Sequence, residues 1–262
     1  MDRAMAFHLP GNPAGDGTGG VRLNMPTRAA LMAAVEADLR AGRGFALATL
    51  NLDHLVKLRG SAPFRAAYLA QSYVVADGNP VVWLSKLAGR PVELVPGSEL
   101  VGPLAALAAR LGVPMGLLGA DQATLDAAAA KLEAENPGLR VVARIAPPYG
   151  LDPAGPVADA CLDELAASGA RLCLLALGAP KQEILAARGL ERVPGIGFAS
   201  VGAGVEFAAG TQARAPALVR KLALEWLWRL GREPKRLAAR YAACFAILPG
   251  LARDARRLRG QG

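Results

Sequence analysis

The chain has 262 residues, of which 53 % are hydrophobic, enough for one large domain or for one domain with an appendage. Its three cysteines lie far apart and outside any CxxC spacing, which argues against a disulfide framework or a zinc site and favours a reducing compartment. No apolar run reaches the roughly 20 residues of a membrane-spanning helix. These properties predict a soluble, cytoplasmic protein.

The formal charge of +8 is unevenly distributed along the chain. Residues 212–262 carry twelve Lys or Arg against three acidic residues, a net of +9, and the preceding residues sum to −1. Such a tail indicates an anionic partner: acidic lipid, a diphosphate or nucleic acid. A tail that only improves solubility is the alternative. The aromatic residues Trp226, Trp228, Tyr241 and Phe245 among the basic ones favour a surface that binds a partner.

In chain order, residues 1–20 are rich in Gly and Pro, lack the apolar segment of a secretory signal, and predict a disordered lead-in. Residues 21–211 alternate between helices and short, almost continuously apolar strands. We expect helices at 27–43, 62–71, 81–88, 98–111, 122–136, 156–167 and from 180 to 188, and strands at 45–50, 73–77, 115–118, 141–145, 171–177 and 197–201. This alternation predicts an α/β fold, a Rossmann-like parallel sheet sandwiched by helices.

Residues 212–262 differ in character and predict a basic helical appendage. Two helices are expected, at 216–230 and 234–248, each with a proline at its first position. In the second helix one apolar stripe contains Leu237, Tyr241, Phe245 and Leu248. The stripe is typical of packing against a domain, whereas residues 251–260 (LARDARRLRG) resemble a basic amphipathic segment that lies on an anionic bilayer.

Four polar or Gly-rich elbows follow predicted strands: Thr49–Asn51, Asp77–Gly78, Gly119 and Gly178–Glu183. Parallel sheets bind ligands at the carboxyl ends of their strands, so these elbows predict one site. Asp77 ends an apolar strand directly before Gly-Asn-Pro. It either forms an Asx turn or presents its carboxylate to a ligand.

Several chemistries lack their motifs in this sequence. The only two histidines, His8 and His54, exclude a multi-histidine metal site, and no DxD motif is present. The dinucleotide-binding GxGxxG after a strand, the P-loop and the GxSxG nucleophile elbow are also absent. The elbows supply carboxylate, hydroxyl, amide and backbone N–H groups, which suit a general base and an anion cradle without a metal or cofactor.

Short motifs follow one another in order from about Thr49 to Tyr241. They are Thr49-x-Asn51, Ala76-Asp77-Gly78, Val95-Pro96-Gly97-Ser98-Glu99-Leu100, Leu118-Gly119, residues 176–183 (ALGAPKQE), 201–204 (VGAG), Ala209-Gly210, Arg214-Ala215-Pro216, 224–230 (LEWLWRL) and Glu233-Pro234. Each motif is short, but the ordered set resembles the WecG/TagA/CpsF family of bacterial glycosyltransferases.

The resemblance implies an enzyme that moves a sugar from a UDP-sugar donor to an undecaprenyl-diphosphate-linked (polyprenyl-diphosphate) acceptor in cell-envelope or exopolysaccharide synthesis. The sugar would be N-acetylmannosamine, its uronic acid or glucuronic acid, transferred with inversion and without a metal or cofactor. The enzyme would be cytoplasmic and peripheral on the anionic inner face of the cytoplasmic membrane. No nucleic acid is implied, and self-association that covers the apolar appendage is compatible with the sequence.

The family context assigns candidate roles to individual residues. Asp77 is the candidate general base, and Thr49 and Asn51 on the neighbouring elbow would orient the sugar or diphosphate. Because a proline opens the helix after Gly178, free N–H groups there suit a phosphate. Further substrate contacts are expected from Gly78, Gly97, Gly119, Gly178, Pro180, Lys181, Gln182, Glu183 and Arg214, and appendage contacts to diphosphate or membrane from Arg229, Arg236 and Arg240. Alternatively, Lys181 and Glu183 are simply solvated on the first helical turn.

Two positions depart from the family pattern. Glu206 stands where an Asp is common, and Ala239 stands where many relatives have a second basic residue. The motifs that bind UDP do not distinguish one sugar from another, so UDP-glucose or another hexose donor is an alternative. A non-catalytic nucleotide-sugar or nucleic-acid binder is the alternative outside enzymes.

Overall fold

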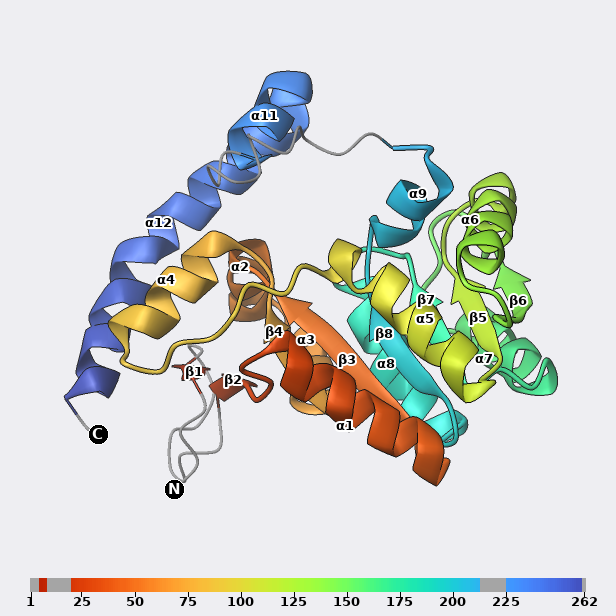
Figure 1. The fold of residues 1–262 in the computed structure, drawn as a ribbon. Helices are drawn as coiled ribbons and strands as arrows, with labels where there is room; N and C mark the ends of the chain where they lie inside the picture. Colours follow the sequence, from red (N-terminus) through yellow and green to blue (C-terminus); the bar gives the residue numbers. More distant parts are fainter. Residues whose placement is uncertain (1–4, 9–19, 213–224, 261–262) are drawn as a thin grey trace.

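The computed structural model of the chain describes residues 5–8, 20–212 and 225–260, without the side chains of His8, Glu225, Arg229 and Arg236. Its centre is a parallel sheet of six strands in the order β4-β3-β8-β7-β5-β6 (Figure 1). The strands are β3 (Phe45–Leu50), β4 (Tyr73–Ala76), β5 (Met115–Leu118), β6 (Val141–Ile145), β7 (Leu172–Leu175) and β8 (Gly197–Ser200). The predicted α/β class with a Rossmann-like sheet is therefore confirmed.

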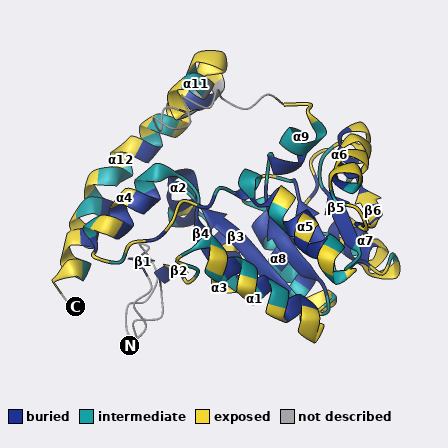
Figure 2. Ribbon diagram, in the orientation of Figure 1, coloured by how far each residue is buried: buried dark blue, intermediate teal, exposed yellow. Residues whose placement is uncertain are grey.

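Helices cover both faces of the sheet. The bounds in the body are α1 (Arg28–Ala41), α2 (Leu52–Gly60), α3 (Ala62–Leu69), α4 (Asn79–Leu87), α5 (Val101–Leu111), α6 (Gln122–Glu135), α7 (Pro156–Ala167), α8 (Lys181–Arg192) and α9 (Gly204–Ala209). Helices α1, α5 and α6 share one apolar cluster, and α7 and α8 pack in another on the other side. Because β3, β4, β5, β7 and β8 lie between these layers, their residues are buried almost without interruption (Figure 2).

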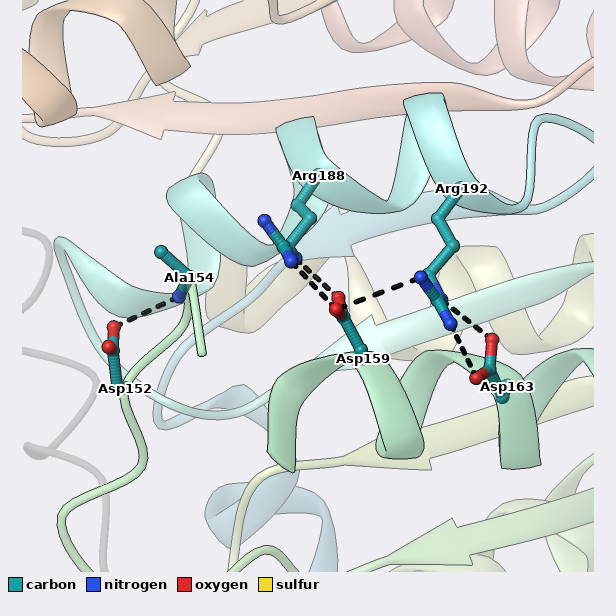
Figure 3. A network of polar contacts seen from close by, with 6 residues as sticks. All are labelled: Asp152, Ala154, Asp159, Asp163, Arg188 and Arg192. Atoms are coloured by element: carbon teal, nitrogen blue, oxygen red, sulfur yellow. Dashed lines mark hydrogen bonds and ion pairs between the residues drawn. The ribbon is translucent and has the colours of Figure 1, made fainter. Parts of the chain in front are cut away.

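Polar contacts join α7 and α8 on the outer surface of their layer. Arg188 of α8 forms two hydrogen bonds with Asp159, and Arg192 forms two with Asp163, one turn along α7 (Figure 3). A further contact of 3.7 Å joins Arg192 to Asp159. These forked pairs lie at the surface and join α7 to α8, which extends to Arg192.

The amino-terminal region contains two strands that the sequence did not predict. Strand β1 (Met5–His8) pairs antiparallel with β2 (Gly20–Leu23). Met5 and Phe7 are buried with Val21 and Leu23, so both strands place alternate residues in the core. The expectation of disorder throughout residues 1–20 is wrong for these positions, while residues 1–4 and 9–19 lie outside the described residues.

Three helical segments in the body also differ from the prediction. The polar elbow after β3 is the start of α2, which Asn51 caps by accepting a hydrogen bond from the His54 N–H at 3.0 Å. The helix expected at 98–111 begins as a separate 3-10 turn, η1 (Gly97–Glu99), followed by α5. Helix α9 was not predicted, because six residues are too few to show a helical period.

The appendage contains α11 (Glu225–Arg232) and α12 (Pro234–Arg259), and α12 lies along α4 and α2 (Figure 1). The helix continues through Pro249, although the sequence predicted an end at Leu248. Burial of Cys244, Leu251 and Ala255 in one cluster with α2 and α4 accounts for this, because packing continues on both sides of the proline. None of the described helices is long and apolar enough to cross a membrane.

Candidate active site

The predicted elbows lie at one edge of the sheet, which is formed by the carboxyl ends of the parallel strands. We call this edge the rim. Asn51 follows β3, Asp77 follows β4, Gly119 follows β5 and Gly178 follows β7. Strand β4 lies on one side of β3, while β8, β7, β5 and β6 lie on the other. The chain order thus reverses at β3, and such a reversal is where open α/β sheets bind ligands.

Asp77 and Thr49 meet at this reversal. The register pairs Thr49 with Val75 and Leu50 with Ala76, so Thr49 and Asp77 point to the same face from adjacent strands. The Thr49 hydroxyl donates to the Asp77 carboxylate over 3.5 Å, a long hydrogen bond. The Asp77 N–H extends the ladder by donating to Leu50 O at 2.8 Å. Thr49 is buried, and Asp77 at the rim is half-buried.

Two glycines shape the rim around this pair. Gly78 has φ +116°, a conformation that side chains rarely adopt, and it turns the chain from β4 into α4. Gly97 opens η1, and a Cβ there would lie 3.1 Å from Thr49 Oγ1 and 3.4 Å from Ser200 O. Both predicted glycines therefore lie beside the Thr49–Asp77 pair. Gly78 is favoured by its positive φ, and Gly97 by the close approach of Thr49.

Asn51 also lies at this rim and is half-buried. Its side-chain oxygen accepts the capping hydrogen bond from the His54 N–H, so the group that it can offer a ligand is its amide N–H₂. The sequence reasoning placed Asn51 correctly at the rim. The capping role was missed with helix α2.

The first turn of α8 contains a buried polar network. The Gln182 amide donates to Glu183 Oε1 at 2.9 Å, and its oxygen accepts from the Gly202 N–H at 3.2 Å. Gln71 of the loop after α3 donates to the Glu183 carbonyl at 3.2 Å. Burial raises the pKa of the Glu183 carboxyl to about 7. These contacts tie α8 to the turn after β8.

This burial changes the expected roles of the α8 residues. Gln182 is 3 % exposed and Glu183 has no exposed surface, so the alternative of a solvated Glu183 is wrong, while its predicted substrate contact stays a prediction. Lys181, in contrast, is half-buried. The Gln182 N–H donates to Gly178 O at 3.3 Å, so part of the expected row of free N–H groups is already used within the turn. Direct contacts from Lys181 and Gln182 to substrate stay predictions.

Gly119 and Gly178 have different surroundings. A Cβ on Gly119, which has φ +129°, would lie 2.6 Å from the carbonyl carbon of Ala176. The glycine is therefore required for the close approach of the chains after β5 and β7. Gly178 has φ +69°, is exposed, and has open space at its Cβ position. Pro180, two residues after Gly178, is the N-cap of α8.

A buried His54–Tyr68 pair lies beneath α2 and α3, and the sequence reasoning missed it. His54 Nδ1 and the Tyr68 hydroxyl are 2.7 Å apart. Burial lowers the pKa of His54 to about 3 and raises that of Tyr68 well above its usual value, with the charges of Glu183 and Asp77 adding to the second shift. The spacing of Leu55 and Leu58 around His54 was the available signal, since it places His54 on the inner face of a helix.

The predicted appendage arginines are only partly described. Arg214 lies outside the described residues, as do the side chains of Arg229 and Arg236. Arg240 forms an ion pair of 2.9 Å with Asp53 of α2. Because Asp53 also pairs with Lys57 at 2.8 Å, two cations meet at one carboxylate close to the rim.

Aromatic side chains of the appendage gather where α11 meets α12. The Trp226 ring contacts Tyr241 and Phe245 with centroids 5.9 and 5.5 Å apart. Phe245 is 52 % exposed, whereas Leu237 is buried and Leu248 packs against the apolar cluster of α2 and α4. The predicted stripe is therefore divided between α12's contact with the body and an exposed aromatic surface.

Two further observations concern carboxylates. Glu206 of α9, which departs from the family pattern, is half-buried, and burial raises its pKa. Among the described side chains no three His, Cys, Asp or Glu residues gather closely enough to hold a metal ion.

A parallel sheet with helices on both faces and a reversal of strand order at β3 defines an α/β protein of the doubly wound, Rossmann-like class. The model of the WecG/TagA/CpsF glycosyl transferase family matches residues 18–261. The chain therefore belongs to this family, and the resemblance seen in the sequence motifs is confirmed.

Proposed function

We propose that this glycosyltransferase moves a sugar from a UDP-sugar to a polyprenyl-diphosphate-linked acceptor, with inversion and without a metal. The carrying observation is the Thr49–Asp77 pair at the reversal point of the sheet, where the Thr49 hydroxyl lies 3.5 Å from the half-buried carboxylate. Membership of the family supports sugar transfer to a lipid-linked acceptor in general terms.

Asp77 acts in this proposal as the general base that accepts the proton of the attacking acceptor hydroxyl. Thr49 donates to one carboxylate oxygen, Oδ2, and so helps to orient the group. The short backbone contact from Asp77 N–H to Leu50 O anchors the residue to the sheet. Carboxylate and acceptor are thereby held in one geometry, which is a main source of rate acceleration.

The donor diphosphate binds across the same rim, near Gly178 and the first turn of α8. Its charge is balanced by cationic side chains, for which Lys181 and the appendage residues Arg214, Arg229 and Arg236 are the candidates. The positive net charge of residues 212–262 supports this assignment. The transferred sugar is N-acetylmannosamine, its uronic acid or glucuronic acid, with UDP-glucose as the alternative donor.

The appendage also brings the enzyme to the inner face of the cytoplasmic membrane. Exposed Trp226, Leu227 and Phe245 gather at one end of the appendage, among basic residues. Aromatic and basic side chains together favour the interface of an anionic bilayer. A chain that ends at Gln212 is expected to lose flotation with anionic vesicles, and unchanged flotation would remove the membrane role.

The enzymatic test is UDP release from a set of UDP-sugars with a short-chain prenyl-diphosphate-sugar acceptor. Asp77→Asn should lower kcat by roughly 100-fold or more, because the amide is no base. The control Asp163→Asn changes a surface carboxylate of α7 that pairs with Arg192 and should leave turnover intact. Wild-type turnover in Asp77→Asn would refute the base assignment, and strong inhibition by EDTA would refute the metal-free mechanism.

A further inference from the structure

Asp53 joins two parts of the protein that are far apart in sequence. Its side chain, on the first turn of α2, is 10 % exposed, and its carboxylate forms ion pairs with Lys57 Nζ at 2.8 Å and Arg240 Nη2 at 2.9 Å. Lys57 belongs to the same helix, whereas Arg240 belongs to α12 of the appendage. One carboxylate therefore receives a cation from the body and a cation from the appendage.

Lys57 extends this contact to the rim of the sheet. Its ammonium group also donates to the carbonyl oxygen of Ala179 at 3.1 Å. Ala179 lies between Gly178 and Pro180, directly before α8 begins at Lys181. A continuous line of polar contacts therefore leads from α12 through Asp53 and Lys57 to the loop that opens α8.

The apolar contacts of α12 do not by themselves define its position along α2 and α4. Leu237, Cys244 and Leu251 are buried, but apolar burial has no directional preference. Asp53 is buried on α2, which packs against α12, so this carboxylate lies within the helix contact. The ion pair between Asp53 and Arg240 adds an attraction that depends on the position of α12, because the energy of two opposite charges weakens as they move apart.

We propose that Asp53 is a positioning residue that couples the docking of the appendage to the shape of the loop before α8. Arg240 docks on Asp53, and the doubly paired carboxylate holds Lys57 where it reaches the Ala179 carbonyl. When Arg240 leaves, Lys57 alone must neutralise Asp53, and its ammonium group is drawn away from Ala179. This role for Arg240 differs from the predicted contact to a diphosphate.

The first test needs no substrate: hydrogen–deuterium exchange of the full chain, read in peptides that cover residues 178–184. Arg240→Met should raise exchange there by roughly tenfold, although Arg240 does not touch this loop, and Arg240→Lys should restore it to within about twofold. Arg256→Met is the matched control, since Arg256 is an exposed arginine of the same helix. It should leave the loop unchanged.

Two further variants separate coupling from local effects. Lys57→Met should raise exchange at 178–184 while α12 stays protected, because Arg240 still pairs with Asp53. In an Asp53→Asn background, Arg240→Met should add less than about twofold to loop exchange, since the shared carboxylate is gone. Additive effects of the two substitutions, or loss of protection in α12 with an unchanged loop after Arg240→Met, would overturn the coupling.

A kinetic test rests on the proposed function and is separate from the exchange tests. Arg240→Met should lower kcat of sugar transfer, because the loop borders the reacting groups, and Arg240→Lys should recover most of it. A residue that only docks the appendage would change KM for the lipid acceptor at constant kcat. If transfer is not detected at all, the proposed function fails while the exchange tests still decide on the coupling.

Discussion

The hydroxyl of Thr49 lies 3.5 Å from the carboxylate of Asp77, across two adjacent parallel strands at the point where the chain order reverses. Neither residue is distinctive by itself. Their meeting depends on the β3–β4 register, which turns both side chains to one face. This relationship leads to the first prediction.

Thr49→Val should lower kcat by roughly tenfold, since it removes the hydroxyl that orients the carboxylate but keeps the shape of the side chain. Thr49→Ser is the matched variant, because it keeps the hydroxyl and should retain most activity. The measurement is UDP release at saturating donor. If Thr49→Val and Thr49→Ser lose activity equally, the methyl group and not the hydroxyl is the important part.

Gly97→Ala should impair activity more than stability. Its new Cβ would lie 3.1 Å from Thr49 Oγ1 and 3.3 Å from Cγ2, so Thr49 must shift away from its place beside Asp77. We expect a loss of about 1–3 kcal/mol in unfolding free energy and a larger relative loss of kcat. Gly102→Ala is the control, because nothing lies within 4 Å of its Cβ position in α5. Urea unfolding measures the stability of both variants, and UDP release measures their turnover. A wild-type kcat in Gly97→Ala would contradict the prediction that the new Cβ displaces Thr49.

Glu183→Gln should change how stability depends on pH. Burial raises the pKa of Glu183 from 4.5 to about 7 in the folded protein. Below pH 4.5 the carboxyl is protonated in both states and its contribution is constant. Between pH 4.5 and 7 the unfolded chain ionises first, so the folded state loses stability as pH rises, on the order of 3 kcal/mol in total. Above pH 7 the loss is complete.

A glutamine at position 183 carries no titrating group, so the variant should lack this decline and be more stable than wild type at pH 8. Its side-chain oxygen can still accept from Gln182. Glu135→Gln, at the exposed end of α6, is the control and should keep the wild-type profile. Denaturant unfolding at pH 5 and pH 8 measures the change in unfolding free energy with pH. The same change in wild type and in Glu183→Gln would contradict the prediction.

Tyr68→Phe should destabilise the fold by about 1–3 kcal/mol, because it leaves the buried Nδ1 of His54 without its partner at 2.7 Å. Tyr149→Phe is the control, since Tyr149 is fully exposed and should be neutral. Thermal or urea unfolding distinguishes the two. Equal stability of both variants would mean that the buried hydrogen bond contributes nothing net.

Much of the fold was predictable because its strands and helices have local sequence patterns. Continuous apolar runs such as residues 45–50 predict strands buried on both faces, and the elbows after them predict the rim, since all strands of a parallel sheet end at the same edge. Asp77, Thr49 and Asn51 were placed correctly on this basis. The match of the family model to residues 18–261 agrees with the motif order.

Other features depend on contacts between separate segments of the chain and have no local sequence pattern that predicts them. Three examples are the pairing of β1 with β2, the burial of Glu183 and the ion pair of Arg240 with Asp53. In each case the contacting residues come together only when the chain has folded. From the sequence alone, a charged residue on the first turn of a helix, such as Glu183, is expected to be solvated. Only the packing of neighbouring segments shows that it is buried. Periodicity along the chain reports which side of an element is buried, whereas the partner on that side is selected by packing and charge in three dimensions.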